Sequence, residues 1–354
     1  MSKPPKTRTG GKAEKLSGAA PTVAVIGGGL AGINTAFQLI KAGFAVTIFE
    51  AASILGGNTS SVDVNGTEHD VYPHMFCDWY VNFWHMFENE LGLSRDRYFE
   101  ARPSVKMRQK GSPDYAELFN PTSLAACIHN LRSGAMKPAE MLLLGFSELD
   151  LLSFPFERSG LNQLQQLDVN GFIYSRGYST EPIAKMENYI LSLIWSINSE
   201  QTAAATYQNF LRHAWQFPNH APFAWMLKGS LSKQLIAPAQ ARLRELGCTI
   251  KHGTAITCLR IEDDKPVLTM ASAFGGNMVS ERAFDYAVCA VPPQALASLV
   301  LAKGGNPSCR SMVECEPTLA NLQRLDSVAI PVVDLYLNKK LKDFPKESIG
   351  LAGS

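Results

Sequence analysis

The chain has 354 residues, of which 46% are hydrophobic, and its formal net charge at pH 7 is only +1. This length exceeds one ordinary hydrophobic core, so we expect two domains. The balanced charge argues against a nucleic-acid-binding protein, which would carry a basic excess on some face. The apolar content predicts a globular protein, and no uncharged apolar run reaches the length of a membrane span.

Residues 1–20 form a polar, basic segment in which five lysines and arginines stand against Glu14 alone. No apolar segment of the secretory type follows, so we expect a disordered tail. Weak electrostatic adhesion to an anionic membrane is the second interpretation. The seven cysteines are scattered and include no C-x-x-C pair, which favours free thiols in a reducing, cytoplasmic compartment.

A strand, a glycine turn, a helix and a second strand follow the tail. The apolar run of residues 23–26 predicts a buried parallel strand, and three consecutive glycines end it. Residues 30–41 carry apolar side chains at helical spacing, and residues 45–49 form a second apolar run that ends at Glu50. Gly27, Gly29 and Gly32 have the G-x-G-x-x-G spacing, which in this context predicts a dinucleotide-binding Rossmann unit.

Each residue of this motif has a physical role. Gly27 permits the tight turn, Gly29 lets a pyrophosphate approach the helix N-terminus, and Gly32 lets the helix pack close to the strand. Glu50 can accept both hydroxyls of an adenosine ribose and would repel a 2′-phosphate. The motif therefore predicts the following cofactor-binding residues: Gly27, Gly28, Gly29, Leu30, Ala31, Gly32, Glu50 and Ala51.

A second glycine pair comes six residues after Glu50, and the sequence EHDVYPHMF follows at residues 68–76. With the first motif, these segments resemble the FAD-dependent amine oxidase and phytoene desaturase superfamily, in which G-x-G-x-x-G, an acid, G-G-[RK] and G-x-H-x-F occur in this order. The greatest similarity is to plant-type and cyanobacterial-type carotene desaturases and the hydroxysqualene dehydroxylase group. The resemblance implies bound FAD and adds further cofactor-binding residues: Gly56, Gly57, Asn58, Thr59, His74 and Met75.

Two positions depart from the family pattern. Asn58 stands where the family has Arg or Lys, and Tyr72 stands where a glycine precedes the histidine by two. The resemblance places His74 beside the flavin, whereas its base rate favours a satisfied structural residue. His69, His74 and His85 have no spacing typical of a zinc site, so we expect no metal.

The stretch from about 100 to 225 is predicted to be a mostly helical insertion, with a strand and turn at residues 102–114 and helices at 141–154 and 189–197. A further helix is predicted from Trp79 to Leu91, where aromatic residues keep helical spacing. By resemblance the insertion corresponds to the family's substrate region, which in carotene desaturases is apolar and can face the membrane.

The chain then returns to the first domain with a helix at 231–246 and strands at 248–251 and 255–261. The resemblance places the backbone of Ile256 against the adenine, and Ala290, in the strand FDYAVCAVPP, near the same half of the nucleotide. We therefore predict an α/β fold, with a Rossmann-type FAD/NAD(P)-binding domain at residues 21–75 and 226–300. A helical and mixed α+β substrate domain would comprise residues 76–225 and 301–354.

Near the end of the sequence, the partial alternation of residues 330–341 predicts a strand. Residues 349–354 resemble the middle of the family's substrate sheet, so the resemblance covers residues 22–354 and stops within a domain. We expect the chain to be a fragment of a longer polypeptide that, by itself, neither holds FAD tightly nor turns over.

The resemblance implies an FAD-dependent oxidoreductase that dehydrogenates or desaturates a lipophilic isoprenoid or polyene substrate, with possible peripheral membrane contact. An FAD-dependent amine oxidase is the first alternative, and a non-catalytic flavoprotein or cofactor-free scaffold is the second. The sequence offers no paired nucleophile and base, so it predicts no catalytic side chain. Flavin would supply the hydride chemistry, and the protein would supply orientation and electrostatics.

Overall fold

The computed structural model describes residues 19–72, 74–109, 111–155, 163–215, 222–275, 279–301, 310–325, 327, 329–333, 335, 337–339, 341–342 and 345–352. The chain divides into two compact units, the first comprising Met1–Gly57 and Gln240–Leu325, the second Asn58–Ala239 and Asp326–Ser354. Apart from residues 19 and 20, the predicted tail lies outside the described residues.

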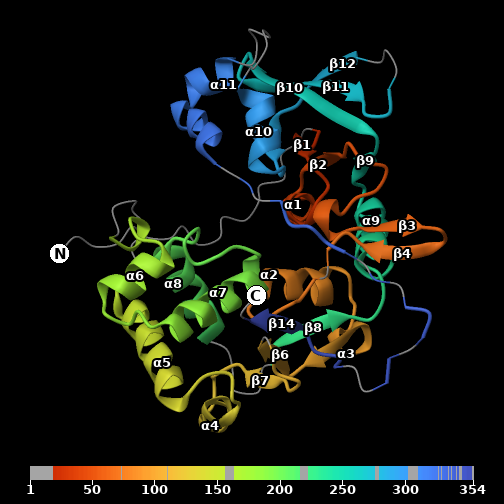
Figure 1. The fold of residues 1–354 in the computed structure, drawn as a ribbon. Helices are drawn as coiled ribbons and strands as arrows, with labels where there is room; N and C mark the ends of the chain where they lie inside the picture. Colours follow the sequence, from red (N-terminus) through yellow and green to blue (C-terminus); the bar gives the residue numbers. More distant parts are fainter. Residues whose placement is uncertain are drawn as a thin grey trace. The chain divides into compact units, whose positions relative to one another are not determined.

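The first unit is built on a parallel sheet with the strand order β13-β1-β2-β9, of which β1, β2 and β9 are labelled in Figure 1. The helix α1 connects β1 to β2, as the sequence predicts, and its buried face contains Ile33 and Phe37. A parallel sheet with a helical crossover confirms the predicted Rossmann-type fold. The elements are β1 Thr22–Ile26, α1 Leu30–Lys41, β2 Ala45–Phe49, β9 Thr249–Lys251 and β13 Tyr286–Cys289.

An antiparallel sheet of β10, β11 and β12 completes the first unit together with short helices. Its core joins the two sheets, because Phe49 of β2 meets Phe284 edge to face at 5.8 Å between ring centroids. The elements are α9 Ala237–Glu245, β10 Thr254–Glu262, β11 Lys265–Ser272, β12 Val279–Ala283, α10 Pro293–Val300, α11 Arg310–Cys315 and the 3₁₀ helix Pro317–Arg324.

The second unit contains the predicted helical region, whose buried core includes Leu164, Phe172, Ile183 and Leu191. Its α-helices are α2 Val81–Trp84, α3 Arg95–Tyr98, α4 Leu124–Arg132, α5 Pro138–Ser153, α6 Val169–Ser175, α7 Glu181–Trp195 and α8 Ala204–Trp215. Two π-helical segments, His85–Glu90 and Ser232–Ile236, and the 3₁₀ helices Gly57–Thr59 and Gln163–Gln165 accompany them. Its strands are β3 Ser61–Val64, β4 Thr67–Asp70, β5 Phe99–Arg102, β6 Ser104–Gln109, β7 Ala116–Phe119, β8 Ala224–Leu227 and β14 Ile349–Ala352.

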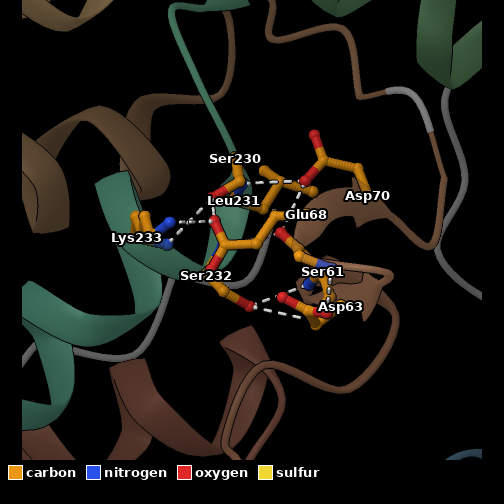
Figure 2. A network of polar contacts seen from close by, with 9 residues as sticks. Ser61, Asp63, Glu68, Asp70, Ser230, Leu231, Ser232 and Lys233 are labelled. Carbon is orange, nitrogen blue, oxygen red and sulfur yellow. Dashed lines mark hydrogen bonds and ion pairs between the residues drawn. The ribbon is translucent and has the colours of Figure 1, made fainter.

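A polar network fastens the β3–β4 hairpin to the segment before α9 (Figure 2). The Ser61 backbone N–H donates to Ser232 Oγ at 2.8 Å, and Asp70 Oδ1 accepts from the Leu231 N–H at 2.9 Å. Glu68 accepts a hydrogen bond from Ser230 Oγ, which holds the pKa of this carboxyl below its usual range. These bonds group residues 58–75 and 226–239 within the second unit, whereas the predicted division gave both segments to the dinucleotide domain.

Two further predictions about the chain's division and its last strands differ from the structure. Residues 301–325 group with the first unit rather than with the substrate domain, because α11 and the 3₁₀ helix that follows it pack near β10 and α10. The predicted strand at 330–341 is wrong for the described part of that range, in which no residue pairs in a sheet. β14 does join a sheet, pairing in parallel with β6, but it lies at the edge of the order β14-β6-β7.

Candidate functional site

The candidate site lies at the carboxyl end of β1, where Gly27 to Gly32 turn the chain into α1. Gly27 has a φ of 101°, and a Cβ there would lie 2.5 Å from the carbonyl oxygen of Ala290. A Cβ on Gly32 would lie 2.0 Å from the carbonyl oxygen of Gly27. Both positions therefore require glycine, since real Cβ atoms do not approach backbone oxygen so closely. In open parallel sheets, ligands bind beyond this end of the strands.

Gly29 differs from its neighbours because its surroundings are open. A Cβ at this position would meet only the carbonyl oxygen of Gly56, at 3.9 Å. Gly29 is also the N-cap residue of α1, where no side chain caps the helix and the first turn holds no acidic residue. An uncapped helix N-terminus with an open approach has the geometry that an anionic pyrophosphate requires.

The carboxylate of Glu50 is held in place by two backbone donors. Its Oε2 accepts from the Gly28 N–H and its Oε1 accepts from the Ala52 N–H, both at 2.8 Å. The Glu50 main chain extends the sheet, because its N–H donates to Lys251 and its carbonyl accepts from Thr254, both at 2.9 Å. Each carboxylate oxygen retains a second lone pair, so a fixed Glu50 can still accept ribose hydroxyls.

The second glycine pair approaches the first directly. The Gly56 N–H donates to the carbonyl of Gly28 at 2.8 Å, and Gly56 forms an isolated parallel bridge with Gly29. A Cβ on Gly57 would lie 3.5 Å from Gly29 Cα. The main chain of the second glycine pair therefore lies directly against the first turn at Gly29.

His252 belongs to the same region, although the sequence did not single it out. It lies in the turn between β9 and β10, where the Gly253 N–H donates to the carbonyl of Ala52 at 3.0 Å. Burial lowers the pKa of His252, and the positive charge of Arg244 lowers it further, while Glu50 acts in the opposite direction. A histidine in a strand turn has no periodic signal, and only the pairing of β9 with β2 brings it near Glu50.

The predicted residues are distributed over both units. The glycine turn, Glu50, Ala51, Gly56, Gly57, Ile256 and Ala290 lie in the first, and Asn58, Thr59, His74 and Met75 lie in the second. Ile256 sits on β10 opposite Met270, just before a register shift, and the Ala290 N–H donates to the carbonyl of Ile26 at 2.8 Å. Their contact with a cofactor remains a prediction.

His74 has a local structural role in the second unit. Its Nδ1 lies 2.7 Å from the carbonyl oxygen of Tyr72, which can only accept, so Nδ1 donates this hydrogen bond. Its ring stacks on Phe76 with centroids 6.2 Å apart. Met75 accepts at its sulfur from Ser348 Oγ, 3.5 Å away. Within the described chain, no group of three His, Cys, Asp or Glu side chains is arranged to hold a metal ion.

Comparison with known proteins agrees with the fold. A family described as an NAD(P)-binding Rossmann-like domain matches residues 25–89. The zeta-carotene desaturase of Synechocystis sp. is 26% identical over 235 residues, which cover 64% of this chain and 47% of that protein. The 15-cis-phytoene desaturase of an Oncidium hybrid cultivar is 23% identical over 336 residues, which cover 91% of this chain and 53% of that protein.

Among solved structures, putrescine oxidase bound to putrescine matches with a TM-score of 0.58 at 13% identity, over 79% of this chain and 60% of that one. The desaturase relatives support the chain's resemblance to the amine oxidase and phytoene desaturase superfamily, and the oxidase structure shows a similar fold. The resemblance drawn from the glycine motif and the EHDVYPHMF segment is thereby confirmed. The chain spans about half the length of the two desaturases.

Proposed function

We propose that the chain binds FAD and is part of an oxidoreductase that dehydrogenates a lipophilic, polyene-type substrate. The open surroundings of Gly29, at an uncapped helix N-terminus beside the fixed carboxylate of Glu50, carry this proposal. The names of the relatives support the substrate class, since two of them are carotene or phytoene desaturases. When bound, FAD would supply a hydride acceptor.

The chain's own groups would hold the adenosine diphosphate half of the cofactor. The N–H groups that begin α1, at Leu30 and Ala31, would donate to the pyrophosphate, and Glu50 would accept the ribose hydroxyls. The backbone of Gly56 and Gly57 would exclude water from the same anionic group. Glu50 favours FAD or NAD over a 2′-phosphorylated nucleotide, because two carboxylate and phosphate charges would repel each other.

FAD titration of the longer polypeptide expected to contain this chain, with flavin fluorescence as the readout, tests the cofactor. In Gly29→Val the branched side chain would occupy the open approach, so we expect at least a tenfold loss of affinity. Gly145→Ala is a matched control in the second unit, where a Cβ would meet no atom within 4 Å. Unchanged affinity in Gly29→Val, with the control equal to the parent, would reject the site.

Anaerobic reduction of bound flavin, in the longer polypeptide expected to contain this chain, tests the substrate class. We expect bleaching of the flavin absorbance with polyenes and no change with di- or polyamines. Bleaching by amines alone would favour an amine oxidase. This alternative is tested because the fold is similar to that of putrescine oxidase. Tight flavin binding with no reduction by either class would favour a non-catalytic flavoprotein.

We also propose that the helical region contacts a membrane surface, which would supply such a substrate. Leu142, Phe146 and Leu149 of α5 are each more than half exposed, and their spacing places them on one helix face. On the neighbouring α4, Leu124 and Ile128 are also exposed. No described helix has the length and apolarity that would take it across a bilayer, so the contact would be peripheral.

The charges beside this apolar face suit an anionic membrane. Arg132 ends α4 and Lys137 precedes α5, and both side chains are exposed. Apolar area together with flanking cations favours interfacial binding. Flotation with anionic vesicles tests this contact. The variant Leu142→Gln/Phe146→Gln should no longer float with the vesicles. The matched control Val62→Thr/Val64→Thr should float with them as the parent does. Flotation unchanged by the first pair would exclude this surface.

A further inference from the structure

Two carboxylic acids meet inside the helical core of the second unit. Glu148 of α5 is 9% exposed, Glu187 of α7 is 2% exposed, and Tyr207 of α8 is 1% exposed. The Tyr207 hydroxyl donates to Glu148 Oε1 at 3.3 Å and also lies within hydrogen-bonding reach of Glu187. A single hydroxyl proton cannot satisfy two carboxylates, so the cluster has too few hydrogen-bond donors among the residues that the structure describes.

The described part of the chain also gives the cluster no compensating cation. Among the described residues, no Lys, Arg or His is paired with either acid, and Glu187 Oε2 has no hydrogen-bond partner. Arg212, the nearest cation along α8, donates its Nη2 to the carbonyls of Leu152 and Phe154 at 3.2 and 2.9 Å. Burying two unpaired negative charges costs far more free energy than keeping a proton.

Of the other ionisable groups on α5, α7 and α8, His213 is exposed and Glu140 lies in the first turn of α5, and those named next have partners of their own. On α5, Asp150 pairs with Arg176 at 2.7 Å. On α7, Glu181 pairs with Lys185 at 2.7 Å, and the Tyr189 hydroxyl donates to the carbonyl of Lys106 at 3.2 Å.

The remaining neighbours add no charge to the cluster. On α4, the His129 ring lies against Phe119 at 4.7 Å between centroids, and Arg132 is exposed. The sequences of α6, of β14 and of the 3₁₀ helix at residues 163–165 contain no Asp, Glu, Lys, Arg or His. The carboxyls and Tyr207 therefore face one another.

We propose that Glu148 and Glu187 form a proton-operated latch, in which the packing of α5, α7 and α8 holds only while the pair retains a proton. Burial raises the pKa of Glu148 to about 7 and that of Glu187 to about 8, and the repulsion between the two acids adds to the second. In the unfolded chain both acids ionise near their ordinary pKa, so the folded state binds more protons between that pKa and the raised values. Stability of the helical region therefore falls as pH rises through this range and levels off above it.

Native-state hydrogen exchange of the full chain tests the latch. Peptides from α5, α7 and α8 are compared with a peptide from α1, which corrects for the intrinsic effect of pH on exchange. Each retained proton changes an opening equilibrium about tenfold per pH unit, so we expect protection of the three helices to fall at least about tenfold between pH 6 and 8. Protection of α1 should stay level after correction.

Substitutions assign the effect to the pair. Glu148→Gln/Glu187→Gln keeps the shape and removes the titration, so protection should become independent of pH. Glu181→Gln, an exposed acid on the same helix α7, should behave as the parent does. Tyr207→Phe removes a hydrogen-bond donor that stabilises the ionised acids. The fall in protection of the three helices should therefore extend to higher pH in this variant.

Two results would overturn the latch. One is the parent pH dependence persisting in the double glutamine variant. The other is loss of protection at pH 6 in that variant, with Glu181→Gln intact, because it would mean that the carboxylates are ionised and required. Neither result depends on flavin, so the latch and the cofactor assignment stand or fall separately.

Discussion

The glycine turn of the first unit and the helix α5 of the second use glycine in opposite ways. In the turn, a Cβ on Gly27, Gly28 or Gly32 would lie 2.5, 2.4 or 2.0 Å from a neighbouring atom. On α5, a Cβ on Gly145 would meet nothing within 4 Å. In the turn the missing side chain is a packing requirement, and on α5 it leaves only a flexible residue in a helix. Glycine is therefore a packing requirement in the turn, whereas Gly145 on α5 meets no such requirement.

The sharpest test of this contrast is Gly32→Ala. Its Cβ would lie 2.0 Å from the Gly27 carbonyl oxygen, which belongs to the backbone and cannot rotate away. We expect a loss of about 3 kcal/mol in the free energy of unfolding of the first unit, measured by chemical denaturation. Gly29→Ala, whose Cβ has room, should leave this free energy nearly unchanged. Equal destabilisation by both would mean that the turn is not packed as described.

A smaller effect is expected in the second unit at Gly350, where β14 approaches α7. A Cβ there would lie 1.8 Å from a ring carbon of Tyr189, which is a side chain and can shift. We expect Gly350→Ala to cost about 2 kcal/mol, and Tyr189→Leu/Gly350→Ala to recover part of that loss. Additive losses in the double variant would show that the ring is not the obstacle.

The smallest expected change has the opposite sign. Gly145→Ala should raise the free energy of unfolding by about 0.5–1 kcal/mol, because alanine loses less conformational entropy in a helix and the site has room. Thermal unfolding followed by circular dichroism measures it. A destabilised Gly145→Ala would contradict the contrast between the two units, since it would show that glycine on α5 is also held by packing.

Local sequence patterns predicted the elements from β1 to Glu50 well. Predictions elsewhere were less accurate because they depended on contacts between residues distant in sequence. The run from β1 to Glu50 has bounds close to those predicted, because periodicity, glycine and the closing acid all lie within one short segment. The predicted strand at 330–341 was wrong because alternating apolar residues indicate an apolar face but do not specify a neighbouring strand for it to pair with. Val333 and Leu335 are exposed, so these apolar side chains are not buried against any such neighbour.

The same limit applies to the site and to the division of the chain. His252 and the Glu148–Glu187 pair have no sequence signature, since burial and neighbours that are remote in sequence define them. The hairpin that contains Ser61 joins the second unit through a bond to Ser232, and the two partners are 171 positions apart in sequence. No local pattern could have revealed that attachment.

The order of strands in the first sheet has a consequence for biosynthesis. β1 lies between β2 and β13, and Thr22 bonds to Asp285 across 263 positions of sequence. At the usual rate of translation, about 10–50 s pass between the emergence of β2 and that of β13. During this interval a two-stranded parallel pair is only marginally stable and one edge of β1 is unpaired. The parallel sheet therefore stays incomplete while the helical region is synthesised. A chaperone that protects the nascent chain would act during this interval.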